Sequence, residues 1–366
     1  MSLFVTAAAG TEKALKEELR ELGLRRVRAD RGGVRADGGR DEAGLVCLGT
    51  RIGVRVLIEV TRFACPHEDA LYDGVSAVEW ERWITPRHTL AVTSVSRDSR
   101  LRHTNYIAQR TKDAIVDRQR RREGARSSVE RHDPDLGIFV HLKRDEAAVF
   151  LDASGGSLHA RGWRARGGEA PLKETLAAAL VRMSGWDREA PLVDPMCGSG
   201  TLVIEADLFA RDVPPQSERR RFGLERWADF DAPAARRMRE ARAAVAARAR
   251  ARGPDCAGYD RDPRAIGAAR ENASRARSTA RFEVSAIDRL ALPRAGGLVI
   301  VNPPYGERLE ASWREVGRAL SRLEGSRIAL LAPDDAPRDL LRRAPAHAHR
   351  VYNGRIPCHL LVWEPR

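Results

Sequence analysis

The second half of the sequence alternates short apolar runs with amphipathic stretches of helical period, and this alternation limits the fold more than any other feature. Strands are expected at residues 191–195, 255–260, 281–288, 297–304, 327–333 and 359–364, and helices at 171–186, 200–211, 235–253 and 262–276. Strands that alternate with helices predict an α/β fold with parallel βαβ units and helices on both faces of the sheet. Ligands of such sheets bind beyond the carboxyl ends of the strands, so the loops at those ends form the candidate site.

The first half has the pattern of smaller α+β units. Strands are expected at residues 3–8, 32–38, 44–51, 89–96, 137–143 and 146–154, and helices at 10–24, 73–84 and 105–122. The stretch 154–171 is rich in Gly and Arg and has no sustained period, which predicts a linker. We therefore expect domains at residues 1–62, 63–155 and 173–366, with the linker at 156–172.

Composition narrows the class of protein. Hydrophobic residues make up 43% of the chain and charged residues 31%, which is typical of a soluble globular protein. No window approaches the run of about 20 apolar residues that a membrane helix needs, and the N-terminus lacks the basic start of a signal peptide. We expect a cytoplasmic monomer with no membrane partner. The five cysteines are scattered singly, which indicates neither a metal site nor a disulfide framework. The net charge of +13 points to a polyanionic partner.

The motif VDPMCGSGTLVIEA at residues 193–206 carries a strand directly into a helix. Gly198 and Gly200 allow the backbone to approach a ligand closely, and Thr201 opens a helix whose free N–H groups face that ligand. The motif is not a phosphate loop, because no Gly-Lys-Ser/Thr follows, and it lacks the third glycine of the dinucleotide fingerprint. Asp260, at the end of the next strand, is suited to accept hydrogen bonds from ribose hydroxyls, although it lies much further along the chain than the ~20 residues of a dinucleotide fold. A tight turn without a ligand is the alternative.

A second motif, VIVNPPYG at residues 299–306, ends a buried strand in an amide, two prolines and an aromatic ring. Each proline restricts the residue before it to an extended conformation and contributes no N–H. The Oδ1 of Asn302 and the carbonyl of Pro303 can then accept both hydrogens of a planar amino group, while Tyr305 stacks on the attached base, a contact worth about 1–3 kcal/mol. A Pro-Pro turn after a core strand is the alternative for this motif alone.

Together these motifs resemble a known family. DPMCGSGT, GYDRD and NPPYGERL resemble the class I S-adenosylmethionine-dependent methyltransferases that modify exocyclic amines. LHARGWR at 158–164 followed by APLKETLAAAL, together with the N-terminal sequence, resembles THUMP-domain RNA guanine-N2 methyltransferases of the RlmL and TrmN kind. The resemblance implies a Rossmann-like C-terminal domain preceded by a ferredoxin-like domain and a THUMP RNA-binding domain. Enzymes of this family can be fused to a second methyltransferase domain, for which residues 1–366 leave no room.

The resemblance also implies roles for individual residues. The cofactor S-adenosylmethionine would be bound on its methionine side by the first loop, at its ribose by Asp260 and at its adenine amine by Asp288. The implied cofactor-binding set is Asp194, Pro195, Met196, Cys197, Gly198, Ser199, Gly200, Thr201, Asp260, Arg261, Asp288 and Asn302. The implied catalytic set, which holds the target base, is Asn302, Pro303, Pro304 and Tyr305. No metal is expected.

The function that we expect is methyl transfer to the exocyclic N2 of a guanosine in structured RNA, either 23S ribosomal RNA or tRNA. The nitrogen would attack the sulfonium methyl group in line, and its surplus proton would pass to solvent. Two alternatives from other classes remain open. One is an amine methyltransferase acting on DNA adenine or protein glutamine, which share the NPPY motif. The other is an RNA-binding protein whose methyltransferase fold has lost activity. The basic N-terminal half favours RNA, and the intact NPPY motif disfavours the inactive protein.

Overall fold

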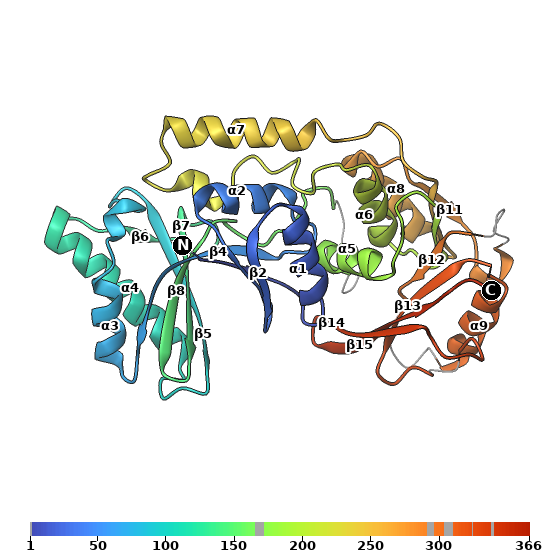
Figure 1. The fold of residues 1–366 in the computed structure, drawn as a ribbon, viewed down its shortest axis with the longest axis horizontal. Coiled ribbons are helices and arrows are strands. Elements are labelled where there is room, and N and C mark those ends of the chain that lie inside the picture. Colours follow the sequence, from blue (N-terminus) through green and yellow to red (C-terminus); the bar gives the residue numbers. More distant parts are fainter. Residues whose placement is uncertain (1, 165–171, 291–295, 304–309, 324, 338–339) are drawn as a thin grey trace. The chain divides into compact units, whose positions relative to one another are not determined.

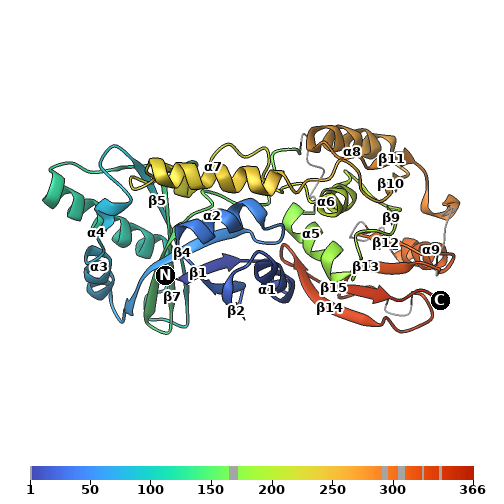
Figure 2. The same cartoon turned by 45° about the horizontal axis from the view of Figure 1, so that its top comes forward.

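The computed structural model describes residues 2–164, 172–290, 296–303, 310–323, 325–337 and 340–366 (Figures 1 and 2). The chain divides into two compact units, each made of segments that are separate in the sequence. The first unit comprises Met1–Thr6, Leu19–Leu158 and Arg219–Ala244, and the second comprises Ala7–Glu18, His159–Glu218 and Val245–Arg366. Helix α1 (Glu12–Glu21) contributes residues to both. None of the helices within these described ranges is long and apolar enough to cross a membrane.

The first unit is built on one eight-stranded sheet with the order β2-β3-β1-β4-β8-β7-β5-β6. Its strands are β1 (Ser2–Thr6), β2 (Arg25–Asp30), β3 (Gly33–Asp37), β4 (Arg55–Ala64), β5 (Thr89–Arg97), β6 (Ser128–Val129), β7 (Leu136–Lys143) and β8 (Glu146–Asp152). All neighbours are antiparallel except β5, which runs parallel to both β6 and β7. Strand β4 pairs with β1 on one side and with β8 on the other, and it runs through position 62, where the first predicted domain ends. The strands on either side of β4 therefore form a continuous sheet.

The helices of the first unit correct two expectations. They are α2 (Arg40–Gly49), α3 (Glu68–Ser76), α4 (Thr104–Glu123), α7 (Ala232–Ala246) and the short 3-10 helices η1 (Trp80–Arg82) and η2 (Gly223–Arg226). The strand predicted at 44–51 is wrong, because the run belongs to α2, which buries Ala43, Val46 and Cys47 at helical spacing. A short apolar run fits either element by periodicity alone. The helix predicted at 73–84 instead begins at Glu68, after a cap in which His67 accepts the backbone N–H of Ala70, and ends at Ser76.

A segment from the predicted methyltransferase range, residues 219–244, belongs to the first unit. Both views show α7 running alongside α2 (Figures 1 and 2). Asp229 forms ion pairs with Arg40 and Arg82, and Arg237 of α7 lies 3.1 Å from Asp41. The side of α7 that faces the unit is apolar, with Met238 buried, whereas most of its charged residues face solvent as expected. The predicted domain ranges are contiguous, whereas the compact units are made of separate segments.

The second unit contains a seven-stranded sheet with the order β11-β10-β9-β12-β13-β15-β14. Its strands are β9 (Leu192–Asp194), β10 (Cys256–Asp260), β11 (Arg281–Val284), β12 (Leu298–Val301), β13 (Arg327–Pro333), β14 (His347–Asn353) and β15 (Ile356–Trp363), and its helices are α5 (Glu174–Met183), α6 (Thr201–Ala210), α8 (Pro263–Ala276), α9 (Glu310–Ser321) and the 3-10 helix η3 (Ile287–Arg289). The five strands from β11 to β13 are parallel, and β15 is antiparallel to both its neighbours. The predicted α/β sheet of parallel strands is confirmed. The connections change direction at β9, between β10 and β12.

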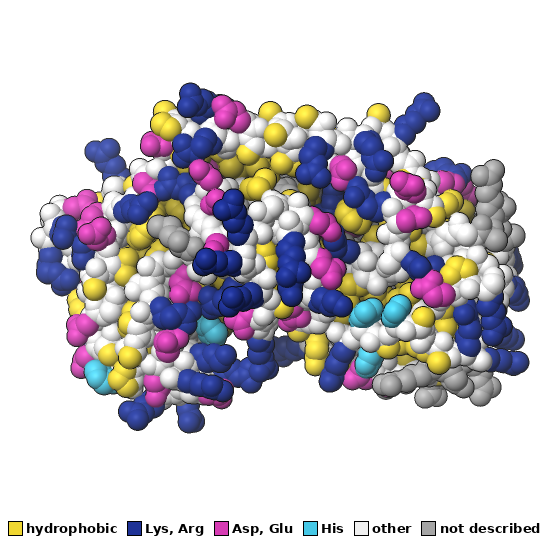
Figure 3. Space-filling view, in the orientation of Figure 1, with side chains coloured by type: hydrophobic (Ala, Val, Ile, Leu, Met, Phe, Trp, Pro, Cys, Tyr) yellow, Lys and Arg dark blue, Asp and Glu magenta, His cyan; other side chains and the backbone are white. Residues whose placement is uncertain are grey.

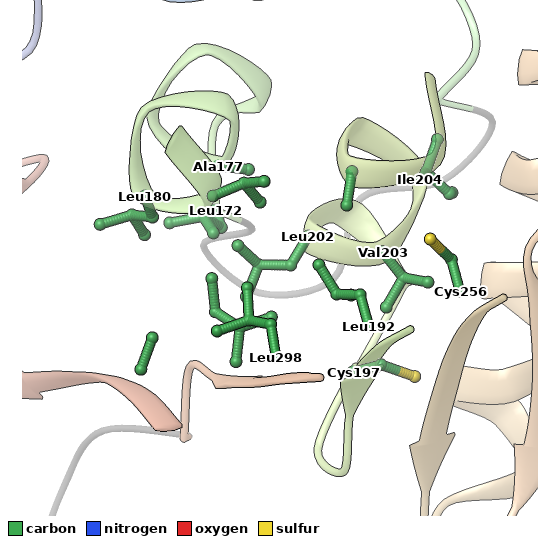
Figure 4. Packing of buried hydrophobic residues seen from close by; sticks show 14 of the residues in the cluster. Leu172, Ala177, Leu180, Leu192, Cys197, Leu202, Val203, Ile204, Cys256 and Leu298 are labelled. Carbon is green, nitrogen blue, oxygen red and sulfur yellow. The ribbon is translucent and has the colours of Figure 1, made fainter. Parts of the chain in front are cut away.

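Apolar side chains cover both faces of this sheet. Leu298 and Ile300 of β12 pack in one cluster with residues of α5, α6 and α8 (Figure 4). Val299 and Val301, which alternate with them, pack in a second cluster with α9. A strand that is buried on both faces has a continuous run of apolar residues. These runs are the reason that the strands could be predicted from the sequence.

The stretch predicted as a linker, residues 156–172, is irregular but packed in its described part. Leu158 is fully buried within the first unit, and Arg161 and Trp163 are buried within the second. Arg161 lies 3.3 Å from Glu205 of α6, and both side chains are 1% exposed. The segment has no regular period, and ion pairing and one large aromatic residue anchor it.

Candidate functional site

The loop after β9 makes a turn that contains two glycines with left-handed backbone conformation. Gly198 and Gly200 both have positive φ, +52° and +82°. A Cβ on Gly200 would lie 2.8 Å from the Phe282 ring and 3.1 Å from the Cβ of Ala269, so a side chain at position 200 is excluded by packing as well as by conformation. Gly200 is also the residue from which α6 starts. The loop therefore directs the first N–H groups of α6 toward the carboxyl edge of the sheet.

Asp260, at the end of β10, holds this loop in place. Its Oδ2 accepts the backbone N–H of Gly198 at 3.0 Å, and its Oδ1 accepts that of Asp262 at 2.9 Å. The N–H of Cys197 also donates to the carbonyl of Tyr259 at 2.8 Å. A carboxylate oxygen can accept more than one hydrogen bond. The half-buried Asp260 can thus receive hydroxyl groups from a ligand without losing its contacts to the loop.

Asp194, at the end of β9, is the most perturbed acid of this edge. It is 2% exposed, and its Oδ1 accepts the N–H of Met196 at 3.0 Å. Burial raises the pKa of Asp194 to about 8, the Met196 hydrogen bond acts in the opposite direction, and the charge of Asp260 adds to the rise. A cation placed against a buried carboxyl of this kind strongly favours the ionised form of the carboxyl. The site is therefore suited to a ligand that carries a positive charge.

Asn302, Asp288 and Arg261 follow the neighbouring strands at the same edge of the sheet. Asn302 is half-buried at the end of β12, which pairs in parallel with β9, and Pro303 after it is buried. Asp288 lies in η3 after β11 and is exposed, as is Arg261 after β10. Parallel strands end at a common edge, so these residues and the glycine loop border one region. Pro304 and Tyr305 lie outside the described residues.

Arg164, which was not predicted as a site residue, forms hydrogen bonds to side chains of the glycine loop. Its Nη2 donates to Thr201 Oγ1 at 3.1 Å and its Nη1 to Ser199 Oγ at 3.5 Å. Its Nε donates to the buried Glu174 at 2.8 Å, which fixes the guanidinium. Asn272 of α8 adds a hydrogen bond to the carbonyl of Ser199 at 3.1 Å. The available signal was LHARGWR, whose last residue is Arg164, but its Gly- and Arg-rich surroundings indicated a linker.

The sequence gives no reason to expect a metal ion at this site. Within the ranges that the structure describes, no three His, Cys, Asp or Glu side chains gather in a way that could hold a metal ion. All five cysteines are buried thiols.

Three family models match the chain in succession. The RlmL ferredoxin-like domain matches residues 2–57, the THUMP domain matches 65–152, and the RMKL-like methyltransferase domain matches 161–361. Curated relatives include the ribosomal RNA large subunit methyltransferase K/L of Syntrophotalea carbinolica, which is 40% identical over 100% of this chain and 53% of its own length. The protein of the same name from Methylococcus capsulatus is 40% identical over 99% of this chain and 51% of its own length. The chain thus spans about half the length of these relatives.

Solved structures show the same architecture over the whole chain. A putative methyltransferase complexed with SAH has a TM-score of 0.88 at 29% identity, covering 100% of this chain and 98% of its own. A possible methylase from Clostridium difficile has a TM-score of 0.90 at 26% identity with the same coverage. A predicted N6-adenine-specific DNA methylase from Listeria monocytogenes has a TM-score of 0.88 at 28% identity, covering 100% of this chain and 96% of its own. The Rossmann-like methyltransferase fold class expected from the sequence is confirmed by these matches.

Proposed function

Because this chain belongs to the family of RMKL-like methyltransferase domains, we propose that it transfers a methyl group from S-adenosylmethionine to the exocyclic N2 of a guanosine in structured RNA. The observation that carries this proposal is the grouping of the glycine loop, Asp194, Asp260 and Asn302 at one edge of the sheet, in a chain that also matches a THUMP domain. The resemblance inferred from the motifs agrees with all three family matches.

The residues present fit the cofactor. Asp194 is a buried carboxyl that would be stabilised as an anion by the cofactor's ammonium group, and Asp260 has acceptor capacity for two ribose hydroxyls. Asp288 would accept the adenine amine. The glycine loop, held by Arg164, leaves room for close backbone contact. When bound, the cofactor supplies an electrophilic methyl group. The SAH complex of a 29% identical relative supports this assignment.

At the target base, this chain's residues would orient the amine. Asn302 Oδ1 and the Pro303 carbonyl would accept the two hydrogens of guanine N2, while Pro304 and Tyr305 would complete the base-binding wall. An aromatic amine is a poor nucleophile because its lone pair is delocalised into the ring. Fixed acceptors favour the positive charge that develops on nitrogen, which stabilises the transition state by preorganised dipoles. The surplus proton would leave to solvent, and a paired guanosine would first have to be flipped out of its helix.

Two observations favour RNA over DNA as the substrate. The THUMP-domain model matches residues 65–152, and relatives at 40% identity are named as ribosomal RNA large subunit methyltransferases. The second candidate is adenine N6 of DNA, because the similar protein from Listeria monocytogenes is described as a predicted N6-adenine-specific DNA methylase.

The experiment is methyl transfer by the purified chain with labelled cofactor, followed by mass spectrometry of digested nucleosides. The substrates are ribosomal RNA and tRNA from cells that lack the gene, with genomic DNA in a parallel reaction. We expect N2-methylguanosine in one RNA fraction. Label in N6-methyladenine of DNA, or at another guanine atom, would overturn the guanine-N2 assignment.

A further inference from the structure

One face of the eight-stranded sheet in the first unit carries phenylalanines that pack on a small apolar cluster of Leu57, Ala148 and Phe150 and remain partly exposed. On the covered face, Leu3 of β1 and Val140 of β7 are fully buried. Their chain neighbours Phe4 and Phe139 point to the opposite face, because successive side chains of a strand alternate. Both are only partly buried. An antiparallel sheet with one solvated face normally presents polar residues there, so partly exposed phenylalanines on its inner strands indicate a binding surface.

A cleft of about 820 Å³ lies on this open face, and we call it the sheet-face cleft. Its floor is a row of three rings, Phe4 on β1, Phe150 on β8 and Phe139 on β7. The ring centroids of Phe4 and Phe139 lie 6.3 and 6.4 Å from that of Phe150. Phe150, the middle ring of the row, is buried, whereas the other two rings are partly exposed. The row runs from β1 in the ferredoxin-like match to β8 and β7 in the THUMP match, and β4 pairs with both β1 and β8.

The side chains that surround the sheet-face cleft are mainly basic, and Figure 3 shows Lys and Arg side chains gathered over the strands of this unit. Six basic residues line it, against three carboxylates, which leaves a surplus of three positive charges. The basic residues are Arg31, Arg35, Arg62, Arg97, Lys143 and Arg144, and the carboxylates are Asp30, Glu59 and Glu146. His141 adds no charge at neutral pH, because burial and the neighbouring Lys143 lower its pKa.

We propose that the sheet-face cleft binds an unpaired stretch of the RNA substrate, with bases stacked on Phe4 and Phe139 and phosphates held by the surrounding Lys and Arg side chains. The proposal rests on the proposed function in taking RNA as the polyanion. It specifies the surface that binds the RNA, and it specifies that the bound RNA is unpaired. The charge surplus selects a polyanion, and the accessible rings select one whose base faces are exposed.

A duplex does not fit these observations as well as a single strand. In a helix the base faces are stacked on one another, and phenylalanine rings on a sheet could not reach them. The guanidinium of Arg35, which pairs with Asp30 and Glu59, stands 5.3 Å from the centre of the Phe4 ring, so a planar cation and an aromatic ring lie side by side. Both groups stack on bases in proteins that bind single strands. An acidic peptide would pair with the Lys and Arg side chains but would have no base to stack on the rings.

The test measures binding of the full chain to a fluorescent unpaired oligonucleotide of about 12 nucleotides and to a blunt RNA hairpin, each at several salt concentrations. Phe139→Leu keeps an apolar side chain but removes the ring. It should weaken binding of the unpaired strand by about tenfold and leave the hairpin and the salt dependence unchanged. The matched control is Phe63→Leu, since Phe63 is a half-buried ring of the same sheet that packs against Gly74 of α3. Thermal unfolding of both variants excludes a folding defect.

Arg97→Ala tests the charges. It should lower the slope of log affinity against log salt by about one, with the exposed Arg236 of α7 as the matched control.

Parent-like binding of the unpaired strand by both cleft variants would overturn the proposal. Displacement of the strand by an acidic peptide, with Phe139→Leu silent, would also overturn it in favour of a protein partner. If the chain methylates RNA yet the cleft variants bind normally, the inference fails and the proposed function stands. If no nucleic acid is methylated, the proposed function fails whatever the cleft binds.

Discussion

The two sheets of this protein use their surfaces in opposite ways. In β12 of the second unit, all four residues are buried, and alternate residues enter two apolar clusters. In β7 of the first unit, buried and partly exposed residues alternate, and the exposed set includes Phe139 and Lys143. A sheet covered on both faces offers a ligand only the ends of its strands, whereas a sheet with one open face offers a surface. This difference is the basis for our proposals that the second unit carries the chemistry and that the first binds a polymer.

The largest expected effect concerns the strand ends of the second unit. Asn302→Ala removes one acceptor for the target amine and should lower single-turnover methyl transfer by about 10²–10³, the range for deletion of one preorganised transition-state group. Binding of the cofactor, measured by calorimetry, should be nearly preserved. RNA affinity should also change little if the first unit carries it. Full activity in this variant would show that Asn302 is not an active-site residue. Loss of cofactor binding would show that Asn302 acts in the cofactor pocket instead.

Asp260→Ala should have the next largest effect. It removes a charged acceptor of two ribose hydroxyls together with the acceptor of the Gly198 N–H, so cofactor affinity should fall by about 10- to 100-fold. Asp262→Ala is the control. It removes the carboxylate that accepts the N–H of Arg264 at the start of α8, so it should lower stability while leaving cofactor affinity close to that of the parent. Equal affinity of Asp260→Ala and the parent would show that the cofactor ribose binds elsewhere.

Arg164→Lys should have a smaller effect and tests a positioning residue. The lysine keeps the charge but loses the fork that reaches Thr201 and Ser199 while bonding Glu174. We expect cofactor KM to rise about tenfold with kcat less affected. Thr201→Val should cost less cofactor affinity in the Arg164→Lys background than alone, because the two residues share one contact. Additive effects would show that Arg164 and Thr201 act independently, and Arg264→Lys, at an exposed site, is the control.

How far the sequence predicts this molecule depends on the range of the interactions involved. The parallel strands and the glycine loop were predicted because continuous apolar runs and glycine at strained positions are local signals. The run at 44–51 was misassigned because eight residues fit strand and helix equally well. Residues 219–244 could not be assigned to the first unit, since Asp229 finds Arg40 only after folding. Arg164 was hidden for the same reason, because the partners that give it a role are remote in sequence.

The sequence predicts the residue types of the candidate site but not their electrostatics. Asp194 and Asp260 were identified from motifs, and the structure places them on adjacent strands. The raised pKa of Asp194 could not have been predicted, because it depends on complete burial by parts of the second unit that are distant in sequence.

That burial gives the smallest expected effect, a change in the pH dependence of stability of the cofactor-free protein. The pKa of Asp194 is about 8 in the folded chain and near its ordinary value of about 4 when unfolded. The folded state therefore binds the proton more tightly, and the stability that this contributes is lost as pH rises from about 4 to about 8. Asp194→Asn removes the titration, so its melting temperature should rise relative to the parent by a few degrees across this window and no further above it. Asp255→Asn, at an exposed carboxylate paired with Arg281, should follow the parent.

A saturating concentration of cofactor should reverse the order of the two melting temperatures, so that the parent melts above Asp194→Asn. In the proposed site the ammonium group of the cofactor would stabilise the Asp194 carboxylate, and the variant would bind the cofactor weakly. Parallel melting curves for parent and variant would show that Asp194 is already ionised and paired in the free protein.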